Sequence, residues 1–226
     1  MKVTYYGHAC FAVEVKGKHL LFDPFITPND KAKAIDINTI KADYILISHG
    51  HQDHLADAVA IAKNTGATVI SNFEIITWAQ NQGIENVHPM NHGGQIEFDF
   101  GKVKYVNAIH SSSFPDGSYA GNPGGFVVAS DEKNFYYAGD TALTMDMQLI
   151  PRFAKIDFAV LPIGDCLTMG IEDAITAADF VKCDKVLGVH YDTMEIIQID
   201  HNDAIKQFKD GNKELVLMNI GETQDF

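Results

Sequence analysis

The sequence predicts an α/β (α+β) protein in which two β-sheets pack face to face and helices cover both outer sides, a four-layer αββα sandwich. The main observation is the order of patterns: each half of the chain begins with short β-type runs and continues with alternating helices and strands. The 226 residues are 46% hydrophobic, which is enough for one large core. Because no internal repeat, low-complexity tract or linker interrupts the chain, we expect a single domain over residues 1–226.

The first half contains short runs rich in β-branched and aromatic residues, separated by glycine, proline and asparagine. A hairpin turn is expected at Lys16-Gly17-Lys18, and two helices are expected to end near Gly66 and Gly83. The predicted strands are 3–6, 10–15, 19–23, 44–47 and 68–70, and the predicted helices are 56–64 and 74–82.

The second half follows the same order, with β-type runs first and alternation afterwards. The predicted strands are 95–98, 103–109, 125–129, 135–138, 158–161, 186–189 and 214–217. The predicted helices are 147–153, 173–182 and 203–208.

The composition narrows the classes of function. A formal net charge of -13 repels phosphate backbones and anionic membranes, so we expect neither as a partner. The three cysteines form no CxxC pair, which is typical of a protein in a reducing compartment. The chain enters a strand without a signal-peptide segment, and no apolar run approaches the ~20 residues of a membrane helix. We therefore expect a cytoplasmic protein that acts on a small molecule.

A dense group of potential metal ligands follows the predicted strand 44–47. His49, His51, Asp53 and His54 lie within six residues, at a turn between an apolar strand and an alanine-rich helical segment. Imidazole and carboxylate groups suit zinc, manganese and iron. A turn can direct alternate side chains toward different points, so two ions can be reached from this segment. A solvated polar loop is the alternative, but this density of ligands favours a metal site.

Three more ligand-type residues share one context, the carboxyl end of an apolar strand. In α/β proteins functional residues collect at these ends, because strands fix positions and loops present side chains. A structural histidine is the better interpretation for either histidine taken alone, but together with the first group they favour one shared site. These residues are His110 after strand 103–109, Asp140 after strand 135–138 and His190 after strand 186–189.

This set resembles the ligands of the metallo-β-lactamase superfamily of binuclear metallohydrolases. The resemblance covers essentially the whole chain and implies two divalent metal ions, Zn²⁺ or Mn²⁺, with Fe²⁺ and Ni²⁺ as further options. It assigns one ion to His49, His51 and His110, a second to Asp53, His54 and His190, and a bridging position to Asp140.

Shorter motifs are similar to those of small bacterial and archaeal metal-dependent hydrolases related to the ascorbate-6-phosphate lactonases. They include Tyr6-Gly7-His8-Ala9-Cys10-Phe11, Gly139-Asp140-Thr141 and His190-Tyr191-Asp192-Thr193. Asp140 stands where the best-known β-lactamases carry cysteine, which argues against antibiotic hydrolysis. His51 and His54 stand where flavodiiron oxygen reductases tend to use other ligands, which argues against redox iron chemistry.

The ligand set implies a specific chemistry. Two divalent ions about 3.5–4 Å apart can share a hydroxide, which is the expected nucleophile. Asp53 is expected to be both a ligand and a proton shuttle. His8 is a candidate general acid or oxyanion stabiliser, with a structural hydrogen bond as the competing interpretation. Asp23 and Ser48 are candidates for orienting ligand histidines, although Asp23 is equally compatible with a turn cap.

Four further residues lie next to ligands or in late loops and are candidates for substrate contacts, with ordinary loop capping as the competing interpretation. They are Ser111, Ser112, Asp165 and Thr168.

The sequence therefore predicts a binuclear hydrolase of a small ester-like substrate, with a phosphodiester favoured and a lactone close behind. A homo-oligomer is compatible with the resemblance. Two other functions stay open: a non-catalytic metal-binding or regulatory protein of the same fold, and a nuclease that processes nucleic acid. The charge of -13 argues against the nuclease.

Overall fold

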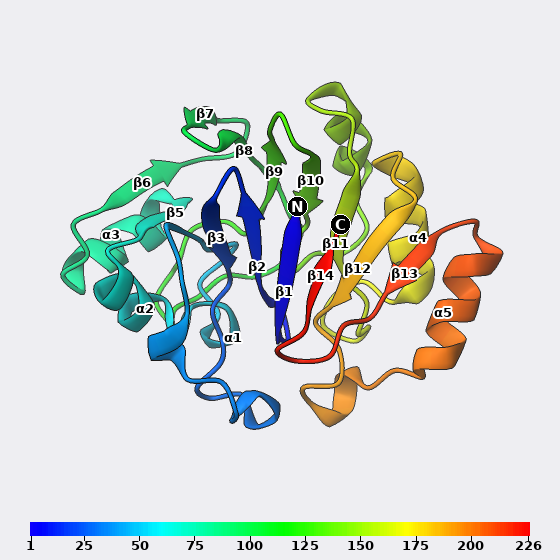
Figure 1. Cartoon of the computed structure of the whole chain (residues 1–226), viewed down its shortest axis with the longest axis horizontal. Coiled ribbons are helices and arrows are strands. Elements are labelled where there is room, and N and C mark those ends of the chain that lie inside the picture. The colour runs from blue at the N-terminus through cyan, green and yellow to red at the C-terminus, as the bar shows by residue number, and fades with distance from the viewer.

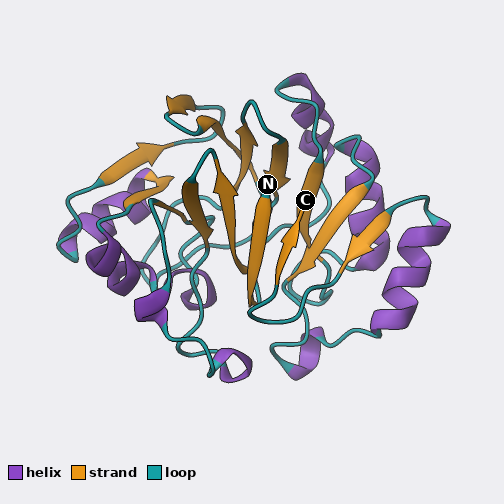
Figure 2. Cartoon of the chain, viewed as in Figure 1, coloured by secondary structure: helices purple, strands orange, loops and turns teal.

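The computed structural model describes residues 1–226 and contains two seven-stranded sheets packed face to face (Figure 1). Helices lie on the outer side of each sheet, as the colouring by secondary structure shows (Figure 2). This confirms the four-layer αββα sandwich that the sequence predicts. No helix combines the length and the apolar character needed to cross a bilayer.

The first sheet is built from the N-terminal half of the chain and one C-terminal strand. Strands β14, β1, β2 and β3 pair antiparallel, whereas β3, β4, β5 and β6 pair parallel. In spatial order the strands are β14 (Thr223–Asp225), β1 (Lys2–Gly7), β2 (Cys10–Val15), β3 (Lys18–Phe22), β4 (Tyr44–Leu46), β5 (Thr68–Asn72) and β6 (Val87–Met90).

The second sheet repeats this plan. Strands β7 to β10 pair antiparallel, and β10 to β13 pair parallel. In spatial order the strands are β13 (Glu214–Val216), β12 (Lys185–Val189), β11 (Phe158–Pro162), β10 (Asn134–Tyr137), β9 (Gly124–Ala129), β8 (Gly101–Asn107) and β7 (Gln95–Phe98).

The helices divide between the two outer faces. The first sheet is covered by α1 (Gln52–Leu55), α2 (Ala58–Thr65) and α3 (Phe73–Asn81). The second is covered by α4 (Ile171–Phe180), α5 (His201–Asp210) and the 3-10 helix η3 (Met145–Arg152). Three short 3-10 turns lie in loops: η1 (Asp30–Ala32), η2 (Ile37–Thr39) and η4 (Glu195–Ile197).

Successive side chains of a strand point to opposite faces of its sheet. The apolar side chains therefore form three layers, one between the sheets and one under each set of helices. In β10, Phe135 and Tyr137 point toward the other sheet while Tyr136 points toward the helices. The Phe22 ring stacks on Phe11 with centroids 4.6 Å apart and meets Phe135 edge-on at 5.7 Å. Aromatic contacts between β3 and β10 therefore join the two sheets.

Some predicted elements differ from the structure. Strands β6 and β14 were not predicted, because β6 contains Pro89 and β14 is polar, features that edge strands tolerate. The predicted helix 147–153 is 3-10 rather than α, since Pro151 cannot donate an α-helical hydrogen bond. Strand β8 ends at Asn107, so His110 lies in the following loop rather than at the strand end.

Candidate metal centre

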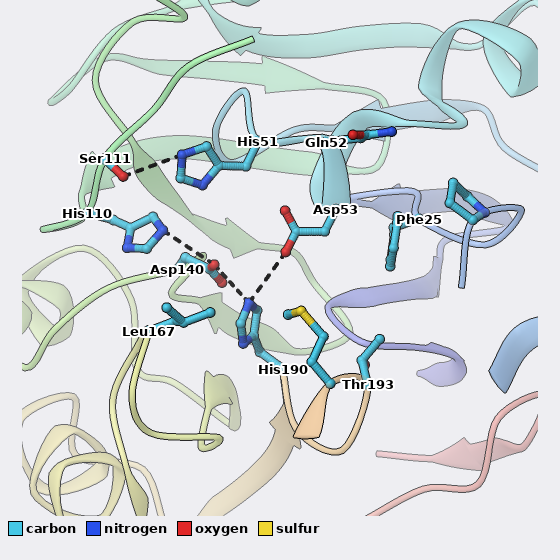
Figure 3. A pocket seen from close by; sticks show the side chains of 12 residues that line it. Phe25, His51, Gln52, Asp53, His110, Ser111, Asp140, Leu167, His190 and Thr193 are labelled. Carbon is cyan, nitrogen blue, oxygen red and sulfur yellow. Dashed lines mark hydrogen bonds and ion pairs between the residues drawn. The ribbon is translucent and has the colours of Figure 1, made fainter. Parts of the chain in front are cut away.

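The seven predicted metal ligands come together where loops leave the carboxyl ends of β4, β8, β10 and β12. Figure 3 shows five of them, His51, Asp53, His110, Asp140 and His190. Oδ2 of Asp140, in the loop after β10, lies near an imidazole nitrogen from each of four histidines. The distances from this oxygen to Nε2 are 3.0 Å for His190, 3.2 Å for His54, 3.6 Å for His110 and 3.9 Å for His49. Asp140 therefore stands at the middle of the cluster.

Potential ligand atoms around Asp140 form three groups, and within each group all of them lie within 4.8 Å of one another. One group, Asp23 with His49 and His54, shares a histidine with each of the other two. Those other two match the ligand sets implied by the sequence, with His8 added to the second. The first is His49, His51 and His110, and the second is His8, Asp53, His54 and His190.

The loops that carry Asp140 and His110 are tied together by Thr141. Its hydroxyl accepts a hydrogen bond from the backbone N–H of Ile109 at 2.9 Å, one residue before His110. Gly139 precedes Asp140 with φ +64, and a Cβ there would meet the Gly124 carbonyl oxygen at 2.7 Å. The Gly-Asp-Thr motif thus combines a tight turn, a ligand and an anchor for the neighbouring ligand loop.

Asp23, at the end of β3, fixes the ring orientation of two ligand histidines. Its Oδ2 accepts from Nδ1 of His54 at 2.7 Å and from the Ser48 hydroxyl at 2.5 Å. The Ser48 oxygen in turn lies 2.9 Å from Nδ1 of His49, so that nitrogen is the donor. In both histidines Nε2 is therefore the nitrogen that could bind a metal ion, and Nε2 of His49 lies 2.9 Å from Nδ1 of His51. Asp23 therefore fixes the orientation of two candidate ligands and, through Oδ1, also accepts from the Ser48 N–H.

Tyr137 was missed by the sequence analysis. Its hydroxyl donates to the same Asp23 oxygen at 2.5 Å, between the two sheets. Burial, reinforced by the charges of Asp23 and Asp140, holds the pKa of Tyr137 well above its usual range, so it remains a donor. No signal in the sequence separates it from the neighbouring core residue Tyr136.

The donor set fits a divalent metal. Nε2 of His54 and Oδ1 of Asp140 are buried and have no hydrogen-bond partner, although such atoms are normally satisfied. Both belong to residue types that bind zinc, manganese and iron. A cation held by these residues would satisfy them.

The histidines of the first group are set to be neutral ligands. Burial and neighbouring imidazoles hold the pKa of His49 well below its usual value. Burial likewise lowers the pKa of His51 and of His110, both less buried. Neutral imidazole is the form that binds a metal ion.

The second group carries the opposite electrostatics. Burial disfavours a charge on His54, but Asp140, Asp53 and Asp23 together hold its pKa well above the usual value. Burial also opposes ionisation of Asp53 and Asp140, yet nearby histidines, His54 foremost, lower the pKa of both carboxyls. The carboxylates around His54 therefore favour a positive charge at this position.

His8 lies behind Asp53 and does not line the cavity over the centre. Its Nε2 donates to Oδ2 of Asp53 at 2.9 Å, and Nδ1 lies 2.9 Å from the Thr193 hydroxyl. Burial lowers the pKa of His8 to about 4, so the ring is neutral at neutral pH and Nδ1 accepts from Thr193. Of the two roles left open by the sequence, the geometry favours the hydrogen-bonded, positioning one.

A cavity of about 550 Å³ opens over the centre, a size that suits a small ligand. Of the four predicted substrate contacts only Ser111 lines it, with its hydroxyl 3.4 Å from Nε2 of His51. Ser112 instead accepts from the Gly50 N–H, and Thr168 donates to the Met169 carbonyl, so both cap loops. Asp165 has φ +60 and also lies outside the lining.

The sequence analysis missed several lining residues that are not proposed ligands; Gln52 begins α1, and the others come from loops without a regular pattern. The missed residues are Phe25, Pro28, Gln52, Leu167, Thr193 and Met194.

The fold and the centre define a metal-dependent hydrolase of the metallo-β-lactamase type. A profile of the beta-lactamase superfamily domain matches residues 2–190, and the chain belongs to that superfamily. Within it the chain belongs to the UPF0173 metal-dependent hydrolases. It is 61% identical over 223 residues to the Flavobacterium johnsoniae member and 61% identical over 224 residues to that of Christiangramia forsetii, with 99% of each chain covered.

Solved structures show the same fold. The metallo hydrolase Igni18 of the archaeon Ignicoccus hospitalis superposes with a TM-score of 0.88 at 34% identity, over 100% of this chain and 98% of that one. An isothiocyanate hydrolase from Delia radicum gut bacteria superposes with a TM-score of 0.79 at 18% identity, over 100% and 99% of the two chains. At 18% identity the second comparison concerns the fold alone.

Proposed function

We propose that the chain is a binuclear metal-dependent hydrolase of small ester-like substrates, for which a phosphodiester and a lactone are the two candidates. The supporting observation is the central position of Asp140 between two groups of ligand atoms. His49, His51 and His110 would hold the first ion, Asp53, His54 and His190 would hold the second, and Asp140 would bridge them.

Zn²⁺ and Mn²⁺ are the proposed ions, with Fe²⁺ and Ni²⁺ as further options. When bound, two such ions supply a hydroxide nucleophile at neutral pH and polarise the ester oxygen. Asp53 faces the cavity, and its Oδ2 is held by His8. Its Oδ1 makes no hydrogen bond within the chain, so this oxygen can take a proton from the attacking water and return it to the leaving oxygen.

The expected setting follows from charge and cysteine usage. With a net charge of -13 and three free cysteines, we propose a small molecule rather than nucleic acid as the partner, and the cytoplasm as the location.

Hydrolysis by protein reconstituted with Zn²⁺ or Mn²⁺ tests this proposal, with bis(4-nitrophenyl) phosphate and γ-butyrolactone offered separately. Chelation should abolish activity, and Asp140→Asn and His49→Ala should each lower it by about a hundredfold or more, because each removes a direct ligand. Circular dichroism should show both variants folded. Asp146→Asn is the matched control, because Asp146 is exposed, belongs to none of the ligand groups, and its side chain only accepts a hydrogen bond from Asn107 at the end of β8. Full activity in Asp140→Asn would contradict the two-metal proposal.

A further inference from the structure

The walls of the cavity over the candidate metal centre carry no cationic side chain. No lysine or arginine is among the twelve lining residues. Apart from the proposed metal ligands, every lining residue is uncharged. These uncharged residues are Phe25, Pro28, Gln52, Ser111, Leu167, Thr193 and Met194.

An anionic phosphate would gain little from such walls. Proteins that recognise phosphate commonly use arginine or lysine, since these donate charge-assisted hydrogen bonds to its oxygens. Here the carboxylates of Asp23, Asp53 and Asp140 also offset most of the charge that two divalent ions bring. The chain as a whole carries -13, which disfavours the approach of an anion.

The walls are instead suited to an apolar group. Leu167 and Met194 line the cavity and are 43% and 38% exposed, so they offer apolar surface to a bound substrate. The Phe25 ring packs on His8 with centroids 5.4 Å apart and faces the same cavity. Figure 3 shows Phe25 and Leu167 on opposite sides of Asp53, Asp140 and His190. An apolar substituent bound between them would remove this surface from water.

We infer that the substrate is an uncharged carboxylic ester with an apolar substituent, of which an alkyl-substituted lactone is the simplest case. This inference rests on the proposed hydrolase function and reverses the order of the two substrate classes that the sequence favours. The residues of the cavity wall would determine which substrate binds, and the proposed metal ligands would serve the hydrolysis of either class.

The reaction consumes one water molecule. The water oxygen forms a bond to the carbonyl carbon, and the bond from that carbon to the ring oxygen breaks. The leaving alkoxide takes up a proton derived from the water, relayed by Asp53, and becomes a hydroxyl. The new carboxylic acid releases its proton to solvent at neutral pH, so one hydroxycarboxylate anion and one proton are formed.

A homologous series of γ-lactones tests the apolar walls, from γ-butyrolactone to γ-nonalactone, with bis(4-nitrophenyl) phosphate as the anionic comparison. We expect kcat/KM to rise about twofold to fourfold for each added methylene, the gain for burying such a group. The corresponding γ-alkyl lactams, which resist hydrolysis, should bind with the same chain-length trend by calorimetry. The phosphodiester should be turned over at least about tenfold less efficiently than γ-nonalactone.

A charge placed in the wall gives the reciprocal test. Leu167→Lys should lower kcat/KM for γ-nonalactone about tenfold and raise it for the phosphodiester, because the new ammonium group repels alkyl chains and attracts phosphate. Ile205→Lys is the matched control, since Ile205 is 45% exposed on α5 and does not line the cavity. It should change neither rate.

The outcomes separate this inference from the proposed function. Phosphodiester turnover equal to or above that of γ-nonalactone, or rates and lactam affinities independent of chain length, would overturn the inference and leave the hydrolase intact. Hydrolysis of neither substrate by the metal-loaded protein would overturn both.

Discussion

Oδ2 of Asp23 lies 2.7 Å from Nδ1 of His54, and both side chains are fully buried. Because a carboxylate only accepts, the Nδ1 proton of His54 is fixed in place and Nε2 points to Asp140 at 3.2 Å. Asp23 also reaches His49 through the Ser48 hydroxyl. One residue outside the proposed ligand set thus orients a ligand in each of the two groups.

We expect Asp23→Asn to lower the affinity for Zn²⁺ by about tenfold to a hundredfold, the usual effect of removing a group that orients metal ligands. The amide keeps the shape of the side chain but loses the charged oxygen that accepts three hydrogen bonds. Competition with a chelating dye measures the affinity.

The matched control for this variant is Asp43→Asn. Asp43 also pairs with a histidine, His19, at 3.3 Å from its Nδ1, but this pair is partly exposed and belongs to none of the ligand groups. It should leave metal affinity unchanged. Equal affinities for Asp23→Asn and the wild-type chain would mean that Asp23 does not orient the ligands.

The local part of the centre could be predicted because its residues are close in the sequence. His49 to His54 form one segment, and His190 directly follows an apolar run. Tyr137 could not be assigned, because it and Tyr136 belong to one buried run and only the packing of two sheets decides which faces Asp23. Sequence patterns reveal which residues are buried, but not what they contact across an interface.

The cavity walls were beyond prediction for a different physical reason. Leu167 and Met194 lie in loops whose backbone is set by tertiary contacts, such as the bond from the Met169 N–H to the Thr141 carbonyl. An exposed leucine in an irregular segment carries no periodic signal. The edge strand β14 was missed likewise, since Thr-Gln-Asp forms a strand only by pairing with β1.

His8 offers a second test of positioning. We expect His8→Asn to reduce kcat about tenfold to a hundredfold with little change in KM, because Asp53 loses the hydrogen bond that holds it. Asparagine tolerates the left-handed backbone that His8 adopts at φ +56 but is too short to reach Asp53. Steady-state kinetics together with metal content measure the effect.

Lys16→Asn is the control for placing asparagine at a left-handed backbone position, since Lys16 has φ +49. Lys16 lies in the exposed turn between β2 and β3, at the opposite end of these strands from His8 and Asp23. This variant should leave both kinetic parameters unchanged. If His8→Asn lowers only the melting temperature and each folded molecule retains full kcat, His8 is structural and does not position Asp53.

The aromatic layer between the sheets should dominate stability. Phe135 is fully buried, stacks on Phe158 with centroids 5.0 Å apart and meets Phe22 edge-on. We expect Phe135→Ala to lower the free energy of unfolding by about 3–5 kcal/mol, through lost burial and the cavity left behind. Phe73→Ala, at a residue 60% exposed, should change it by about 0.5 kcal/mol or less. Urea unfolding measures both, and similar losses in the two variants would contradict the layered core.

Metal binding should also release a proton, for a reason visible in the charges around His54. Asp140, Asp53 and Asp23 hold the pKa of His54 well above its usual value despite burial, so the metal-free protein is protonated there at neutral pH. His49 has its pKa held well below the usual value by burial and nearby imidazoles, so it carries no extra proton. An incoming ion must therefore displace a proton from His54 but not from His49.

We expect loading with Zn²⁺ at about pH 7 to release about one proton from His54, and the affinity to fall about tenfold per pH unit as the pH decreases, since protons then compete better for Nε2. Calorimetry in buffers of different ionisation enthalpy counts the protons. A bound water that ionises would add to this number, so the informative quantity is the difference between the wild-type chain and His54→Gln, which has no proton to lose at this position. Equal proton release by the two proteins would show that His54 is neutral before the metal binds. The carboxylates around His54 would then not explain the pH dependence of metal affinity.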